Sequence, residues 1–264
     1  MSIDFIKMNA LGNDFVIIDN RITNHNLSVE NIIKLSNRKN IGCDQFIILK
    51  KPISHKAMIF MQIYNTDGSI SATCGNATRC IAGLLFEENP QLTNITIETL
   101  AGLLDCQKID QNIIKVNMGI PQIISKNISL FEHNFIHVDV GNPHAVCFVD
   151  KIPHDDKFFF IAPKIENYTA IFPDKTNVEF AEIINDSTIK VRVFERGVGE
   201  TSACGSGACA VAVASIYSKL INKNSVKIIF GDQELLIDYD GKFVFMTGAF
   251  QKIFSGKIYE DFLQ

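Results

Sequence analysis

Short runs of β-branched and aromatic residues recur along the chain and predict a protein built mainly from strands. Each run is rich in Ile, Val and Phe, the residue types that strands favour. Asp240-Gly241 lies between two apolar segments and predicts a hairpin with a type I′ turn. The runs lie at 46–49, 57–64, 95–99 and 113–118 in the first half, and at 135–140, 145–149, 178–184, 189–194, 226–230 and 243–247 in the second.

Helices are fewer in this pattern. Ser28 can cap a helix that continues to about Asn37. Two further runs, 80–86 and 208–214, are apolar on nearly every face, which is typical of a helix enclosed by its own domain. Such a helix needs strands around it. We therefore expect an α/β (α+β) fold in which each half of the chain is a curled, largely antiparallel sheet around one central helix.

Cys74 and Cys204 stand at the beginning of these two helices. Cys74 is followed by Gly-Asn and Cys204 by Gly-Ser, and the two cysteines are separated by about half of the 264 residues. Other features recur in the same order at nearly the same separation: Gly12-Asn13 as Gly141-Asn142, Gln45 as Asn177, and Tyr64-Asn65 as Phe194-Glu195. These features, recurring in one order, predict an internal duplication.

The boundary between the halves is expected near Gly119-Ile120-Pro121, where the strand pattern breaks and a polar stretch to Asn127 follows. This divides the chain into an N-terminal lobe of residues 1–118, carrying Cys74, and a C-terminal lobe of residues 119–249, carrying Cys204. We expect the tail, residues 250–264, to complete the first lobe.

Composition limits the classes of function. A chain of 264 residues with 47% hydrophobic and 20% charged residues is typical of a soluble globular protein with room for two lobes. The net charge of −4, without a cluster of Lys and Arg, argues against nucleic acid as a partner. No apolar run approaches the roughly 18 residues of a membrane helix, and no signal peptide is recognisable. We expect a cytoplasmic protein with a small-molecule partner and no membrane association.

The seven cysteines do not suggest a disulfide framework or a metal site. An odd number in a reducing compartment argues against structural disulfides. No pair has CxxC spacing, and His133 and His137 lack the glutamate of an HExxH motif, so no metal is expected. Four cysteines lie in apolar runs and are expected to be buried as small hydrophobic residues: Cys80, Cys106, Cys147 and Cys209.

Cys74 and Cys204 are the candidates for chemistry. At a helix N-terminus a thiol lies beside unpaired N–H groups and the positive end of the helix dipole, which favours the thiolate. If the two lobes face each other, two such thiols and two helix N-termini surround one site suited to a carboxylate. One thiolate could then remove a proton from one face of an α-carbon while one thiol delivers a proton to the other. This arrangement predicts a racemase or epimerase that needs no cofactor.

The chain resembles the diaminopimelate epimerase family almost from end to end. The combination of a Glu-Arg-Gly-x-Gly-Glu-Thr segment with a following Ala-Cys-Gly-Ser-Gly is highly specific for it. The matching segments are Met8-Asn-Ala-Leu-Gly-Asn-Asp-Phe15, Asp44-Gln45, Tyr64-Asn-Thr-Asp-Gly-Ser69, Cys74-Gly-Asn-Ala-Thr-Arg-Cys80, Gly141-Asn-Pro-His144, Thr176-Asn-Val178, Glu195-Arg-Gly-Val-Gly-Glu-Thr201, Ala203-Cys-Gly-Ser-Gly207 and Met246-Thr-Gly248.

This resemblance implies two pseudo-symmetric lobes, each a β-barrel around a central helix, in a homodimer whose lobes close on the ligand. It implies interconversion of LL- and meso-2,6-diaminopimelate in lysine and peptidoglycan precursor biosynthesis, without a cofactor. Cys74 and Cys204 would be the acid/base pair, and His144 and Glu195 would tune them. The substrate contacts implied are the backbone N–H groups of Gly75, Asn76, Gly205 and Ser206, together with Asn13, Gln45, Asn65, Asn142, Asn177, Glu195 and Arg196.

Each implied role has a plainer alternative. Asn13 and Asn142 follow glycine and could be turn residues. Arg196, which offers a fork for the distal carboxylate, could instead pair with a surface carboxylate. His144 could be a hydrogen-bonded residue of the core.

Small departures from the family pattern leave the substrate preference open. Ala77-Thr78 and Asn9-Ala10 replace the usual Gly-Ala and His-Gly. Three alternative functions follow. A racemase for another amino acid would keep both cysteines but change the groups that bind the distal end of the substrate, here Asn65, Asn177 and Arg196. A proton-shifting isomerase of the phenazine-biosynthesis type would use a carboxylate base instead of two cysteines. A non-catalytic anion-binding protein could use Gly205-Ser-Gly207 as a phosphate nest, but would not need two equivalent thiols.

Overall fold

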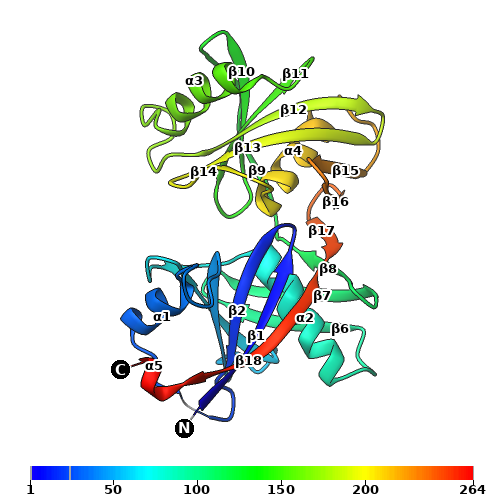
Figure 1. The fold of residues 1–264 in the computed structure, drawn as a ribbon. Coiled ribbons are helices and arrows are strands. Elements are labelled where there is room, and N and C mark those ends of the chain that lie inside the picture. The colour runs from blue at the N-terminus through cyan, green and yellow to red at the C-terminus, as the bar shows by residue number, and fades with distance from the viewer. Residues whose placement is uncertain (1, 24, 264) are drawn as a thin grey trace. The chain divides into compact units, whose positions relative to one another are not determined.

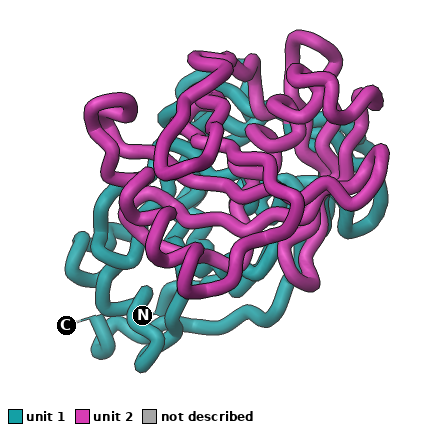
Figure 2. Tube along the Cα trace, turned by 90° about the horizontal axis from the view of Figure 1, so that it is seen from above, with its two compact units in different colours: residues 1–116, 248–264 teal, residues 117–247 magenta. Residues whose placement is uncertain are grey.

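The computed structural model describes residues 2–23 and 25–263, and the chain forms two compact units. Unit 1 contains the residues up to Val116 together with those from Gly248 onward, and unit 2 contains Asn117–Thr247 (Figure 2). The chain therefore passes from unit 1 to unit 2 and returns. Within the described residues, no helix is both long enough and apolar enough to cross a membrane.

Unit 1 is a mixed sheet with one enclosed helix and two short helices outside it (Figure 1). Its elements are β1 (Ser2–Ala10), β2 (Asn13–Asp19), α1 (Val29–Ser36), β3 (Gln45–Lys50), β4 (Ile59–Asn65), β5 (Ile70–Ser71), α2 (Gly75–Glu88), β6 (Asn94–Thr99), β7 (Gly102–Asp110), β8 (Ile113–Asn117), β18 (Gln251–Tyr259) and α5 (Glu260–Leu263).

From β10 onward, unit 2 has the same order of strands and helices as unit 1 has from β1 to β8. Its elements are β9 (Gln122–Leu130), β10 (His133–Asp139), β11 (Pro143–Val149), α3 (Asp155–Glu166), β12 (Asn177–Asn185), β13 (Thr188–Glu195), β14 (Gly199–Thr201), α4 (Gly205–Tyr217), β15 (Ser225–Phe230), β16 (Gln233–Tyr239) and β17 (Val244–Ala249). The end of β17 leads the chain back into unit 1.

The strand pairings repeat along with the elements. In unit 1, β2 pairs with β3 in parallel, β3 with β4 antiparallel, and β4 with β6 in parallel. In unit 2, β11 pairs with β12, β12 with β13, and β13 with β15 in the same three orientations. The internal duplication found in the sequence is thus a duplication of topology.

The helices α2 and α4 are the enclosed elements of their units (Figure 1). In α2 every residue from Asn76 to Phe86 is buried. In α4 burial extends from Gly207 to Ser215, over a run of Ala, Val and Cys side chains small enough for strands to pack closely around the helix. The prediction of a mixed α+β fold of curled sheet with few helices is confirmed.

The duplicated sequence has two halves, β1 to β9 and β10 to β18. The last strand of each half pairs with the first strand of the other half. β9 follows β8 in the chain but pairs with β10, and β18 follows β17 but pairs with β1. No strand was expected in the polar stretch that follows Pro121, but β9 occupies 122–130. Only Ile128 of β9 is buried, so main-chain hydrogen bonds to β10, rather than an apolar face, hold this strand.

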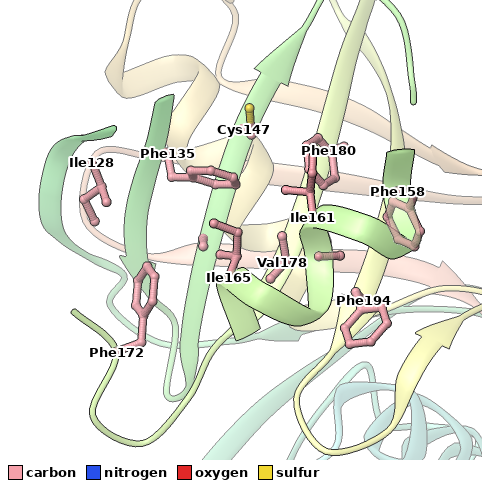
Figure 3. Packing of buried hydrophobic residues seen from close by; sticks show 12 residues of the cluster. Ile128, Phe135, Cys147, Phe158, Ile161, Ile165, Phe172, Val178, Phe180 and Phe194 are labelled. Atoms are coloured by element: carbon pink, nitrogen blue, oxygen red, sulfur yellow. The ribbon is translucent and has the colours of Figure 1, made fainter. Parts of the chain in front are cut away.

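Helix α3 was not expected from the sequence. Its buried face is formed by Phe158, Ile161 and Ile165, which recur at helical spacing. The rings of Phe180 and Phe194 meet Phe158 edge-on, with ring centroids 5.9 Å and 6.2 Å away (Figure 3). The uninterrupted apolar run in the sequence and a proline at position 163 hide this spacing.

Candidate active site

Cys74 is the N-cap residue of α2. Its backbone is extended, with φ −154° and ψ 113°, and its Sγ accepts a hydrogen bond from the Ala77 N–H at 3.5 Å. Thr78 donates to the Cys74 carbonyl from both its N–H and its hydroxyl, each at 2.9 Å. The first N–H groups of a helix, here those of Gly75 and Asn76, have no partner within it. This end of α2 therefore offers an anion site next to a thiol.

Three amide side chains lie at one edge of the unit 1 sheet. Asn13 begins β2 and Gln45 begins β3; β2 and β3 are parallel, with Phe15 opposite Gln45. Asn65 ends the antiparallel strand β4, opposite Gln45, and accepts a hydrogen bond from Gln45 Nε2 at 3.2 Å. Asn65 Nδ2 in turn donates to Ser69 Oγ at 3.0 Å.

Two of these amide side chains have a buried oxygen that accepts no hydrogen bond from the described residues. Asn13 Oδ1 and Gln45 Oε1 have no hydrogen-bond partner among residues 2–23 and 25–263. Buried acceptors are normally paired, and each such group requires an explanation. An ammonium group supplies three N–H donors, so the two oxygens are suited to the amino group of a bound zwitterion.

Asn76 uses its side chain for structure. Its Oδ1 accepts a hydrogen bond at 2.9 Å from Nη2 of Arg79, which is fully buried. The Asn76 side-chain oxygen is therefore already engaged within unit 1. The sequence pattern did not single out Arg79; its signal is a charged residue within an otherwise apolar helix, three residues after Asn76.

Cys204 is the N-cap residue of α4 and is 5% exposed. Its Sγ accepts a hydrogen bond from the Gly207 N–H at 3.4 Å and lies 3.4 Å from Ser206 Oγ. Burial first, and then the carboxyl group of Glu195, raise the pKa of this thiol well above its ordinary value. The Gly207 N–H at the helix N-terminus lowers the pKa, as expected, but desolvation and the acidic Glu195 outweigh it, so the net shift at Cys204 is upward.

His144 is fully buried between two hydrogen-bond partners. Its Nδ1 lies 2.6 Å from Oε1 of Glu179, which is also fully buried, and its Nε2 lies 3.1 Å from Asn142 Oδ1. Burial raises the pKa of the Glu179 carboxyl above its ordinary value. The sequence pattern did not single out Glu179; its signal is an acidic residue in the middle of the buried strand β12.

The remaining candidates of unit 2 lie where β12 begins and β13 ends. Asn177 Nδ2 donates to the Pro143 carbonyl at 2.9 Å, and its Oδ1 accepts from the Arg196 N–H at 3.0 Å. Glu195 Oε1 accepts a hydrogen bond from the Thr201 hydroxyl at 2.5 Å. The Arg196 guanidinium donates to the Asp174 carbonyl at 2.9 Å.

A cavity of about 450 Å³ lies elsewhere in unit 1. It is bordered by β1, β2, β18 and the end of α2, and its charged lining includes Asp4, Asp19, Arg21, Glu88 and Lys257. Arg21 is already bound to Asp19 and Glu88, and Lys257 to Asp4. None of the candidate site residues lines this cavity, so it does not mark the site.

The sequence matches the family model for diaminopimelate epimerase over residues 5–124 and 136–253. It is 41% identical over 258 residues to the diaminopimelate epimerase of Pelagibacter ubique, covering 90% of this chain and 92% of that protein. It is 37% identical to the diaminopimelate epimerase of Teredinibacter turnerae, covering 98% of this chain and 99% of that protein.

Solved structures show the same fold at low sequence identity. A PhzF-family phenazine biosynthesis protein from Bacillus anthracis matches with a TM-score of 0.72 and 15% identity, over 98% of this chain and 99% of that one. A hydroxyproline epimerase from Agrobacterium vitis, with bound trans-4-hydroxy-L-proline, matches with a TM-score of 0.72 and 14% identity, over 97% and 91%. At these identities the likeness concerns the fold alone. By the family model and by its curated relatives, the chain belongs to the diaminopimelate epimerase family.

Proposed function

We propose that this protein is an isomerase that interconverts LL- and meso-2,6-diaminopimelate, the step of lysine and peptidoglycan precursor biosynthesis for which its relatives are named. The observation that carries the proposal is the pair of cysteines. Cys74 and Cys204 are N-caps of the enclosed helices of two units with the same topology. A reaction that treats the two faces of one carbon alike needs such a pair.

In the proposed mechanism, one cysteine acts on each face of the substrate α-carbon. The thiolate takes the α-hydrogen as a proton and becomes a thiol, while the electron pair of the broken C–H bond stays on the substrate. The other thiol delivers its proton to the opposite face and becomes a thiolate. In the reverse direction the two cysteines exchange roles, and no step of this proposed mechanism uses a cofactor.

The ends of α2 and α4 would stabilise the charge that develops. As the α-hydrogen leaves, negative charge spreads onto the α-carboxylate, and N–H donors of Gly75, Asn76, Gly205 and Ser206 are suited to it. The unpaired acceptors of Asn13 and Gln45 are suited to a substrate ammonium group. For Asn65, Asn142, Asn177, Glu195 and Arg196 we propose further substrate contacts, and we propose that the protein acts as a cytoplasmic homodimer.

Incubation with LL-diaminopimelate in D2O tests the function. The expected product is meso-diaminopimelate with one deuterium at the inverted α-carbon, identified by chiral separation and mass spectrometry. Inversion of another amino acid in place of diaminopimelate would change the substrate. Absence of both inversion and exchange with fully reduced thiols would refute the enzyme and favour an anion-binding protein.

A further inference from the structure

An unbroken series of hydrogen bonds in unit 2 leads from a buried carboxyl group to a candidate catalytic thiol. Glu179 Oε1 lies 2.6 Å from His144 Nδ1, and His144 Nε2 lies 3.1 Å from Asn142 Oδ1. Asn142 Nδ2 donates to Ser206 Oγ at 3.3 Å, and that Oγ lies 3.4 Å from Cys204 Sγ. The first member of the series has no place in the mechanism above.

The directions of these hydrogen bonds determine where the protons are. Because the Asn142 carbonyl oxygen faces Nε2, the His144 ring carries a proton on Nε2. A contact of 2.6 Å between Nδ1 and a carboxyl oxygen requires a second proton between them. The pair of Glu179 and His144 therefore holds two protons and is neutral as a whole.

The second proton is placed on Glu179. Burial raises the pKa of this carboxyl, and its Oε2 has no hydrogen-bond partner among the described residues. An unpaired oxygen is far less costly on a neutral acid than on a buried carboxylate. Glu179 is thus the O–H donor to Nδ1, and the ring is the neutral tautomer with its proton on Nε2.

This arrangement decides what Cys204 meets. The Asn142 amide donates to Ser206 Oγ, which leaves the hydroxyl hydrogen of Ser206 free to point at Sγ. A hydroxyl donor stabilises the thiolate relative to the thiol. If the ring proton moved to Nδ1, the bare Nε2 would attract the amide N–H, the amide would turn over, and its oxygen would take the Ser206 hydrogen.

Unit 1 has no such device at the equivalent positions. The strand registers place Phe15 opposite Gln45 and His144 opposite Asn177, so Phe15 and Ile47 stand where unit 2 has His144 and Glu179. The helices α4 and α2 also differ at the position next to this pair. A Cβ on Gly207 would come 2.8 Å from Glu179 Oε1, whereas the corresponding residue in unit 1 is Ala77.

We propose that Glu179 is a positioning residue for Cys204. It holds the imidazole proton on Nε2 of His144 and thereby keeps a hydroxyl donor directed at the thiol. This inference rests on the proposed role of Cys204 as an acid/base group. Two other charged or titratable groups face the series: Glu195, which opposes ionisation of Cys204, and His137, which lies near His144.

Two substitutions of Glu179 separate positioning from charge. In Glu179→Gln the amide N–H can donate to Nδ1 as the acid does, so the Nε2–H tautomer is kept. In Glu179→Leu no donor remains, and the ring proton is free to move. We expect Glu179→Leu to lower kcat about tenfold to a hundredfold with a smaller change in KM, and Glu179→Gln to restore most of that loss.

The pH dependence of alkylation measures the ionisation of the Cys204 thiol directly. Cys204 and Cys74 are alkylated with iodoacetamide over a pH series. Cys74 is quantified in the tryptic peptide 57–79, and Cys204 in the peptide 197–219, where tandem mass spectrometry separates its label from one on Cys209. In Glu179→Leu the midpoint for Cys204 should rise by about one pH unit, while that for Cys74 stays unchanged. Glu182→Leu and Glu182→Gln are matched controls, because Glu182 lies in the same strand and its carboxylate accepts a hydrogen bond from the Ile152 N–H rather than from a member of the series. Neither control should move either midpoint.

A double variant provides the same test if Glu179→Leu fails to fold. His144→Phe with Glu179→Ile copies the apolar pair that unit 1 already packs at these positions, and it should raise the Cys204 midpoint in the same way. An unchanged Cys204 midpoint in a folded variant, or equal shifts in Glu179→Leu and Glu179→Gln, would overturn the proposal. Alkylation needs no substrate, so a wild-type protein that fails to epimerise diaminopimelate would refute the proposed function and leave this test intact.

Discussion

Nδ1 of His144 lies 2.6 Å from Oε1 of Glu179, and neither side chain is exposed to solvent. The pair lies directly behind the edge of the sheet at which Asn142 and Asn177 stand. At that edge the two halves of the chain have kept polar residues and cysteines in matching places. Behind it they have diverged, since unit 1 has only apolar side chains there. The duplication was therefore preserved where residues are available to a ligand and changed where they are not.

Either candidate catalytic cysteine should be indispensable for inversion. In Cys74→Ala or Cys204→Ala one of two obligatory proton carriers is missing, and kcat for epimerisation should fall by about 10³-fold or more. Cys43→Ala is the control: its thiol is buried in unit 1 against Ser36 and should not be needed. Chiral chromatography of the products measures the rate. Epimerisation at more than a tenth of the wild-type rate in Cys74→Ala or Cys204→Ala would contradict the two-base mechanism.

Removing an unpaired acceptor should weaken substrate binding without weakening the fold. Asn13 Oδ1 is buried without a partner among the described residues, so Asn13→Leu removes a group that costs about 1–3 kcal/mol in the free protein. We expect KM to rise at least about tenfold and the free energy of unfolding to stay equal or increase. Steady-state kinetics and urea denaturation measure the two effects. Asn94→Leu, at an exposed strand end, should leave KM unchanged; a loss of stability in Asn13→Leu would speak against the assignment.

The buried guanidinium of unit 1 should be important for stability. Arg79→Met leaves Asn76 Oδ1 without its donor inside the unit and should lower the free energy of unfolding by at least about 2 kcal/mol. Arg21→Met removes contacts to Asp19 and Glu88 that are partly exposed, and it should cost no more than about 1 kcal/mol. Urea denaturation compares the two variants. Equal losses would show that burial of Arg79 adds nothing.

Stability should fall as the pH rises above about 9. Burial raises the pKa of Cys147 to about 12 and also raises the pKa values of Cys80 and Cys106. Above the ordinary thiol pKa the unfolded chain releases these protons while the folded chain keeps them, so each thiol removes about 1.4 kcal/mol of stability per pH unit. Urea denaturation between pH 8 and 10 measures the slope. Cys147→Ala should reduce it, and an unchanged slope in that variant would rule out a contribution from Cys147.

The sequence predicted best those parts of the fold whose pattern is local. Ser28 caps α1 as expected, and the strand-like run at 46–49 lies within β3. β9 was missed because main-chain pairing rather than an apolar face holds it, and α3 because Pro163 and a continuous apolar run mask its periodicity. Strand registers, which bring distant residues to one edge, cannot be obtained from local pattern.

The same distinction applies to the candidate site. Cys74 and Cys204 stood out because each begins an apolar helix, which is a property of neighbouring residues in the chain. Glu179 acts through His144, a residue of another strand that only the fold identifies as its partner. Arg79 differs from other arginines by its complete burial, which only the fold reveals. A buried charge is recognisable from sequence only once the buried face of its element is known.

The pairing of β18 with β1 sets an order for the synthesis of this protein. β1 is translated before unit 2, yet β18, one of its two partners, is translated only after the whole of unit 2. Until then the growing chain carries a strand with an open edge, able to pair with another nascent chain. A message truncated after codon 247 would yield a complete unit 2 attached to a permanently open unit 1, so such a product is expected to aggregate rather than to persist as a half-active enzyme.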